Sequence, residues 1–146
     1  MPPIYELHPM LVHFPIAFFF LSFFFDLLWT VFRRRRDTDW LAKSGTLIMF
    51  LGIIAAVMAG LAGWISEHYV HWTATTAPVV NLHLHLAELT TTWYGLLWLW
   101  RIANLRKLTG WRFRVYMIGA IVGILLISYT GYLGGEMVYD LGVRPS

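Results

Sequence analysis

The segment His8-Pro9-Met10-Leu11-Val12-His13-Phe14-Pro15 runs directly into an apolar run from Ile16 to Phe25. Such an apolar run is typical of a membrane helix, and two imidazoles at its N-terminal end are unusual. A polar group without a partner in hydrocarbon costs several kcal/mol, so these side chains need a reason to be there. We expect the reason to be a ligand held at one face of a small helix bundle.

The composition is that of a membrane protein. Of its 146 residues, 58% are hydrophobic and 13% charged, and the mean hydropathy is +0.61. Four apolar runs are long enough to span a bilayer, and the first lacks the basic region and cleavage site of a removable signal peptide. The sequence therefore predicts an all-α integral membrane protein, a single domain over 1–146 built as a four-transmembrane-helix bundle. The expected helices are 11–32, 44–66, 82–102 and 115–138.

The distribution of positive charge predicts the orientation. Basic residues on the cytoplasmic side are the rule for bacterial membrane proteins, which places both termini on the outer, periplasmic side of the inner membrane. The basic flank then indicates topology and contact with anionic lipid, and we expect no nucleic acid as a partner. Ten of the eleven basic residues lie in or beside the first and third connections: Arg33, Arg34, Arg35, Arg36, Lys43, Arg101, Arg106, Lys107, Arg112 and Arg114.

Three further expectations come from single features of the chain. The absence of cysteine excludes disulfides, iron–sulfur clusters, thiolate zinc sites and covalently attached haem. Asp26 is expected to snorkel inward or to pair with Arg101 or Lys43. The outer connection 73–81 is expected to have no regular structure.

The two halves of the chain resemble each other at an offset of about 71 residues, which suggests two tandem helical hairpins. In this alignment Gly60 and Gly63 fall near Gly131 and Gly134, and His13 falls between the two histidines of the third helix. Copies with two spans each share one orientation in the membrane.

All the histidines gather at the outer ends of the first three helices under this topology. Intramembrane ionisable groups are costly, so such a one-sided cluster marks a candidate site. His83 and His85 are about 200° apart on a helix, so only one of them should point into the bundle. The six are His8, His13, His68, His71, His83 and His85.

A b-type haem would use these residues. It takes axial imidazoles from facing helices, needs no cysteine and packs against small residues. His13 with His85 would form one pair and His8 with His71 a second, giving one or two haems. Arg144 is the only cation on this face for the propionates. The small residues that would leave room are Gly63, Gly131, Gly134 and Gly135.

Two alternatives stay open. A zinc or copper site would combine imidazoles with Glu67, Glu88 or Glu136, as in a membrane metalloenzyme or carrier, although no HExxH spacing is present. The histidines could also serve only as hydrogen-bonding residues at the membrane surface, in a structural subunit of a redox complex.

The motifs HPMLVHFPIA at 8–17 and GYLGGEMVY at 131–139, with Asp26-Leu27-Leu28 and Gly142-Val143, resemble a bacterial family of four-span membrane proteins known as a domain of unknown function. The likeness covers essentially the whole chain. Some relatives are fused to cytochrome c or Rieske-type modules, so the resemblance implies haem b and electron transfer. It also implies functional roles for His8, His13 and either His83 or His85.

One position departs from the family pattern. Many relatives have a histidine before the terminal Gly-Val, where this chain has Leu141. If that histidine is a ligand elsewhere, His68 or His71 must replace it here, or one site is missing. The expected partners are the lipid bilayer, a quinone or a cytochrome c or Rieske-type protein, and a second copy in a homodimer.

Overall fold

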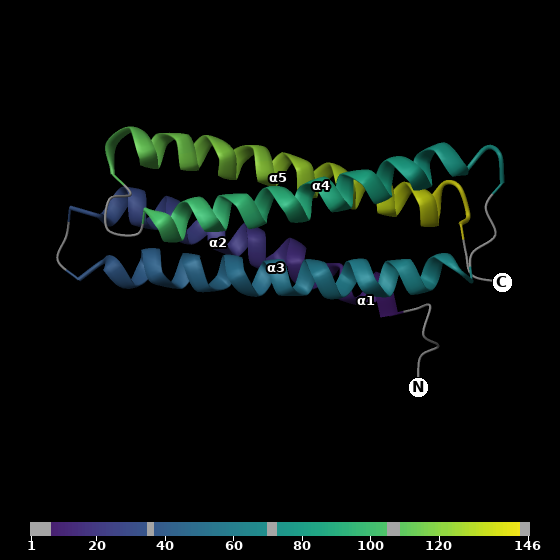
Figure 1. The fold of residues 1–146 in the computed structure, drawn as a ribbon, viewed down its shortest axis with the longest axis horizontal. Helices are drawn as coiled ribbons and strands as arrows, with labels where there is room; N and C mark the ends of the chain where they lie inside the picture. Colours follow the sequence, from purple (N-terminus) through teal and green to yellow (C-terminus); the bar gives the residue numbers. More distant parts are fainter. Residues whose placement is uncertain (1–6, 35–36, 70–72, 105–108, 144–146) are drawn as a thin grey trace.

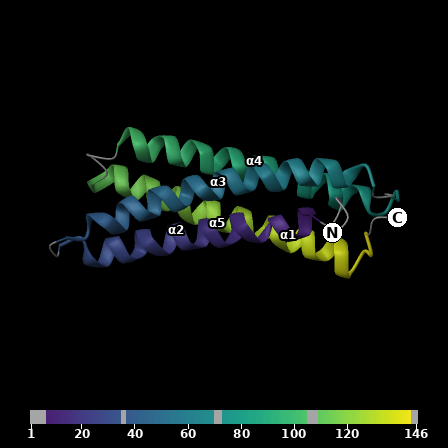
Figure 2. The same ribbon diagram turned by 90° about the horizontal axis from the view of Figure 1, so that it is seen from below.

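The computed structural model describes residues 7–34, 37–69, 73–104 and 109–143, and in these it is all-α. A short helix and four long ones follow each other along the chain, and the long helices run antiparallel (Figures 1 and 2). We call the end where α3 finishes and α4 starts the histidine end, and the opposite end the arginine end. The helices are α1 Leu7–Leu11, α2 His13–Phe32, α3 Asp39–Glu67, α4 Ala77–Ala103 and α5 Gly110–Tyr139.

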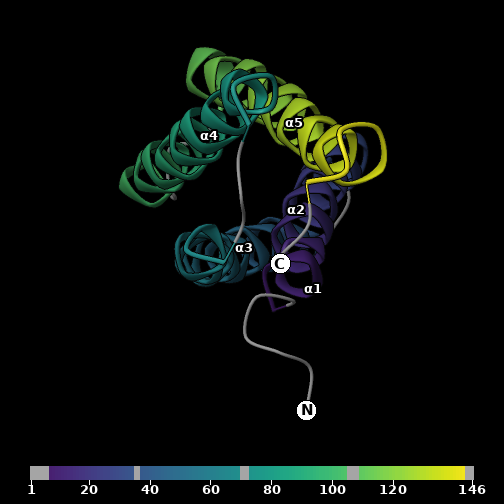
Figure 3. The ribbon, with the colours of Figure 1, turned by 90° about the vertical axis from the view of Figure 1, so that its right-hand side faces the viewer.

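Viewed along its length, the bundle is a ring of four helices (Figure 3). Each long helix packs against its two neighbours in the ring, and α2 and α4 face each other across one diagonal. They meet through long side chains, of which Phe19 and Tyr94 stack with parallel rings 3.6 Å apart. The buried core around this stack also contains Met49, Leu97, Phe113, Tyr116, Ala120 and Ile127.

Three stretches are long and apolar enough to cross a membrane: α1 with α2 (Leu7–Phe32), α3 and α5. The fourth long helix, α4, has 27 residues but is not among them. Between Ala77 and Thr92 it carries His83, His85, Glu88 and three threonines. The fold therefore shows an all-α bundle with three candidate membrane spans, and a fourth span remains a prediction.

The helix ends correct the expected bounds. Helix α3 begins at Asp39 and α4 at Ala77, each five residues earlier than expected, so the expectation of no regular structure over 73–81 is wrong. Pro78 does not prevent the early start of α4, because a proline in the first turn lacks only an N–H that would have no helical partner. Thr73 and Thr76 form the turn before it, each backbone N–H donating to the other's hydroxyl.

The first helix is interrupted at Val12, which separates α1 from α2. Pro15 has no N–H to donate to the carbonyl of Leu11, four residues earlier, and its ring crowds that carbonyl. Val12 itself keeps right-handed helical backbone angles, and α1 packs against α3. His8 therefore reaches the bundle from the short helix that precedes α2.

The structure supports the internal repeat and refines its offset. Residues that face each other across the α2–α4 diagonal are 75 residues apart, whereas their supports on α3 and α5 are 71 apart. The facing residues and their supports thus recur in the second hairpin at these two separations. The facing pairs are His8 with His83, Phe19 with Tyr94, and Asp26 with Arg101.

Candidate functional site

His8 is held at the histidine end by helix α3. Its Nδ1 lies 2.8 Å from the carbonyl oxygen of Ala59. A carbonyl only accepts hydrogen bonds, so Nδ1 carries the proton and donates it. The ring lies against Gly63, where an added Cβ would come within 2.9 Å of Nδ1. The imidazole therefore occupies the space that this glycine leaves open.

His83 is held in the same way by helix α5. Its Nδ1 donates to the carbonyl oxygen of Thr130 at 3.0 Å, and its ring lies beside Gly134, where an added Cβ would be 3.4 Å from Cε1. The residue is only 8% exposed. The supports of the two histidines correspond in the repeat, since Thr130 and Gly134 follow Ala59 and Gly63 by 71 residues.

The two imidazoles face each other, with ring centroids 6.3 Å apart and planes at 88°. Two imidazoles bound to opposite sides of one metal ion, at about 2 Å each, have centroids about 6 Å apart. Edge-to-face ring packing gives a similar spacing. With both Nδ1 atoms donating to carbonyls, each neutral ring keeps a lone pair on Nε2, the atom that metal ions bind.

A polar layer continues below His83. The hydroxyl of Thr130 donates to the carbonyl of Leu126 at 2.8 Å, and that of Thr90 to the carbonyl of Leu86 at 2.6 Å. The two hydroxyls are 3.3 Å apart. Bonding back to their own helices lets these buried side chains sit in the bundle without unpaired groups.

Three of the other predicted histidines, His13, His68 and His85, lie on the outside of the described bundle. His13 is exposed, and His85 is 80% exposed with its Nδ1 3.9 Å from Glu88. His8 and His83, rather than the expected His13 and His85, are therefore the two imidazoles that face each other in the described bundle. Placement of only one of the two α4 histidines in the interior is confirmed. His68 donates from Nδ1 to the carbonyl of Trp64 at 2.9 Å.

The remaining parts of the expected site divide as follows. His71, and with it the expected pair of His8 with His71, lies outside the described residues, as does Arg144. An added Cβ at Gly131 would lie 3.6 Å from Cδ1 of Ile16, and one at Gly135 would meet nothing within 4 Å. In the described ranges no three histidine or carboxylate side chains are grouped closely enough to hold a metal ion, so a zinc or copper site of three or more such ligands is not formed there.

A second polar cluster is buried near the arginine end. Asp26 and Arg101 form a two-pronged ion pair, with Nη2 to Oδ1 at 2.7 Å and Nη1 to Oδ2 at 2.8 Å. Both residues are 1% exposed. The expected pairing of Asp26 with Arg101 is thereby confirmed. Along α4, Arg101 lies about 27 Å from His83, which is close to the thickness of a bilayer's hydrocarbon core.

All four long helices contribute to this cluster. Tyr116 on α5 donates to Oδ2 of Asp26 at 2.6 Å and accepts from Arg101. The guanidinium also donates to the carbonyl of Ala42 on α3 at 2.8 Å. Gly45 lies beneath the pair, where an added Cβ would be 3.0 Å from Nη2. With its charges paired and hydrogen-bonded, the cluster can remain in a membrane interior.

With this geometry in place, comparison with known families identifies the chain. Residues 5–146 match the model of a family described as predicted membrane protein (DUF2231). The chain belongs to this family. The match confirms the membrane-family part of the resemblance, and the family description names no activity. No curated protein and no solved structure matched the chain.

For this DUF2231 chain, the partner of His8 is what the sequence analysis missed. A single offset of about 71 aligned His13 with the α4 histidines, whereas His8 and His83 are 75 residues apart. The signal was present in two other pairs with the same separation of 75: Phe19 with Tyr94, and Asp26 with Arg101. Because an aspartate and an arginine are unlike residues, their equivalence in the repeat is recognised only from the contact between the two side chains.

Proposed function

We propose that the protein is a b-type cytochrome that binds one haem with His8 and His83 as axial ligands and exchanges electrons at the histidine end. One observation carries this proposal: equivalent positions of the two hairpins supply the same side chain. Both rings are fixed through Nδ1 to a backbone carbonyl, with both Nε2 lone pairs left for a shared ligand.

The donor set favours haem over a bare metal ion. Two imidazoles converge, and two is the number of protein ligands that a six-coordinate haem iron takes. Structural zinc takes four protein ligands and catalytic zinc three. When bound, haem supplies one-electron oxidation and reduction.

The chain's own residues would orient the ligands and exclude water. The carbonyls of Ala59 and Thr130 fix the ring orientation and make each Nε2 more basic. Gly63 and Gly134 let the rings approach the helix backbones. The buried Thr90–Thr130 layer and the Phe19–Tyr94 stack close the bundle beneath them.

The membrane arrangement that accompanies this proposal has four spans with both termini on the outer side of the inner membrane. Helix α4 can span despite its polar residues, because His83, Thr90 and Arg101 are buried inside the bundle and have partners. The site then lies at the periplasmic surface, where a quinone or a cytochrome c or Rieske-type protein would exchange electrons with it.

The proposal is tested by a reduced-minus-oxidised absorption spectrum of the full chain purified from membranes. We expect the Soret and α bands of a haem with two imidazole ligands. His8→Ala and His83→Ala should each abolish or shift these bands. His13→Ala and His85→Ala are the matched controls, because both side chains are exposed at the same end, and they should leave the spectrum unchanged.

Absence of both bands from protein that is folded, and produced with haem available, would refute the proposal. Elemental analysis of the same sample would then show whether zinc or copper is present instead. Loss of the bands in His13→Ala with retention in His8→Ala would overturn the choice of ligands.

A further inference from the structure

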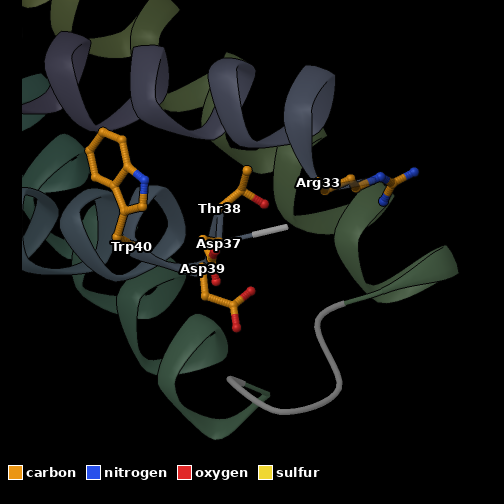
Figure 4. A pocket seen from close by; sticks show the side chains of 5 residues that line it. All are labelled: Arg33, Asp37, Thr38, Asp39 and Trp40. Carbon is orange, nitrogen blue, oxygen red and sulfur yellow. The ribbon is translucent and has the colours of Figure 1, made fainter. Parts of the chain in front are cut away.

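A polar pocket lies at the arginine end, between the last turn of α2 and the first turn of α3. It has a volume of about 380 Å³ and is lined by Arg33, Asp37, Thr38, Asp39 and Trp40. Figure 4 shows Trp40 and Arg33 on opposite sides of the two carboxylates. A positive and two negative side chains therefore share one open space.

These charges do not neutralise each other. No ion pair joins Arg33 to Asp37 or Asp39 in the described part of the chain. The Arg33 guanidinium is instead placed near two aromatic rings, 5.9 Å from the centre of Trp29 and 5.7 Å from that of Phe113. The pocket thus offers separate sites for an anionic and a cationic group of one ligand.

The pocket lies at the depth of lipid headgroups if α2 and α3 span the bilayer. Both belong to stretches long and apolar enough to do so, and the pocket joins their ends. Trp40 is 57% exposed and packs edge-on against Phe25 at 6.1 Å. Tryptophan at a helix end is typical of the membrane–water interface.

We propose that this pocket binds the headgroup of phosphatidylethanolamine, with the phosphate at Arg33 and the ammonium group at Asp37 and Asp39. The pocket's positive and negative side chains complement this headgroup, in which a negative phosphate and a positive ammonium group are joined by a two-carbon link. The headgroup of phosphatidylglycerol is anionic and has no positive group, so it offers nothing for the two carboxylates to bind. A choline headgroup carries positive charge but has no N–H to donate to them.

Lipid retention by the full chain tests the proposal. Delipidated protein in detergent is mixed with equal amounts of phosphatidylethanolamine, phosphatidylcholine and phosphatidylglycerol of identical acyl chains, and bound lipid is counted by native mass spectrometry. We expect phosphatidylethanolamine to be retained about threefold to fivefold over either competitor, as charge-assisted contacts at an exposed site would give. In the wild-type chain, successive N-methylation of the ethanolamine should lower retention stepwise.

Variants assign the contacts. The double variant Asp37→Asn with Asp39→Asn should remove the preference for ethanolamine over choline, whereas Arg33→Gln should weaken binding of all three lipids. Asp140→Asn, an exposed acid at the opposite end, is the matched control and should keep the preference. Equal retention across the N-methylated series, or a preference for phosphatidylglycerol, would overturn the proposal and indicate general lipid contact or anionic-lipid binding.

Discussion

Gly63 illustrates how a single missing side chain builds the histidine end. An added Cβ there would lie 2.9 Å from the Nδ1 of His8, closer than two such atoms can approach without moving. The same nitrogen donates to the carbonyl of Ala59 on the preceding turn of α3. The glycine and the carbonyl therefore fix one ring together.

Substituting this glycine should disturb the site selectively. In Gly63→Ala the His8 ring must shift and lose its 2.8 Å hydrogen bond, so we expect the free energy of unfolding to fall by about 1 to 3 kcal/mol. The matched control is Gly60→Ala on the same helix, where an added Cβ meets nothing within 4 Å. It should stabilise the helix by up to about 1 kcal/mol.

Denaturant titration in detergent micelles measures both effects, and the spectrum of the purified protein reports on His8. Equal behaviour of the two variants would show that Gly63 does not support the ring.

At the level of single residues, the sequence predicted that only one of the two α4 histidines points into the bundle, but not that this one is His83 or which ring it faces. Helix geometry states that His83 and His85 point apart, and the structure buries His83. It does not state which neighbour a short first helix packs against. Helix α1 packs against α3 and brings His8 to the bundle, and spacing alone does not predict that contact.

At the scale of elements, the Asp26–Arg101 pair joins α2 to α4 across the diagonal of the ring. Tyr116 adds α5, and the carbonyl of Ala42 adds α3. Each of these groups is buried or partly buried, so removing one partner leaves another unpaired in a low-dielectric interior.

We expect Asp26→Asn to lower the free energy of unfolding by about 3 to 5 kcal/mol, because the Arg101 charge stays buried without its counterion. Replacing both residues, as in Asp26→Leu with Arg101→Met, should restore much of the loss. Asp39→Asn, an exposed carboxylate at the same end, should change stability by less than about 0.5 kcal/mol. Thermal unfolding in detergent measures all three, and a double variant no more stable than Asp26→Asn would contradict this account.

The number and order of the long helices could be predicted from the sequence because each contains an apolar run. Their ends could not. Helix α3 starts at Asp39 and α4 at Ala77, and the added turns contain the charged Asp39 and Lys43 in α3 and Pro78 in α4, which are also typical of connections. Hydropathy alone also does not mark α4 as a candidate membrane span, because its interior face carries paired polar groups.

At the scale of the whole molecule, the charge distribution and the fold make a joint prediction about orientation. The chain has no cysteine, so single-cysteine variants report one position each. If α4 spans the membrane, Thr75→Cys before it and Thr109→Cys after it lie on opposite sides.

A membrane-impermeant maleimide added to intact bacterial cells with a permeabilised outer membrane should label Thr75→Cys and Asp140→Cys. It should label Thr109→Cys only after the inner membrane is opened. Labelling of Thr75→Cys and Thr109→Cys from the same side would show that α4 does not span.

The opposite charges of Asp26 and Arg101 also determine which hairpins associate. Two copies of the first hairpin, packed as the two hairpins of this chain are, would place two aspartates in contact. Two copies of the second hairpin would place two arginines there. Only an aspartate with an arginine can be buried at this position without repulsion between like charges. The histidine and aromatic pairs at the other levels of the bundle would tolerate the pairing of like or unlike hairpins. This one level of the bundle therefore disfavours the pairing of like hairpins from two chains and directs each first hairpin to a second hairpin.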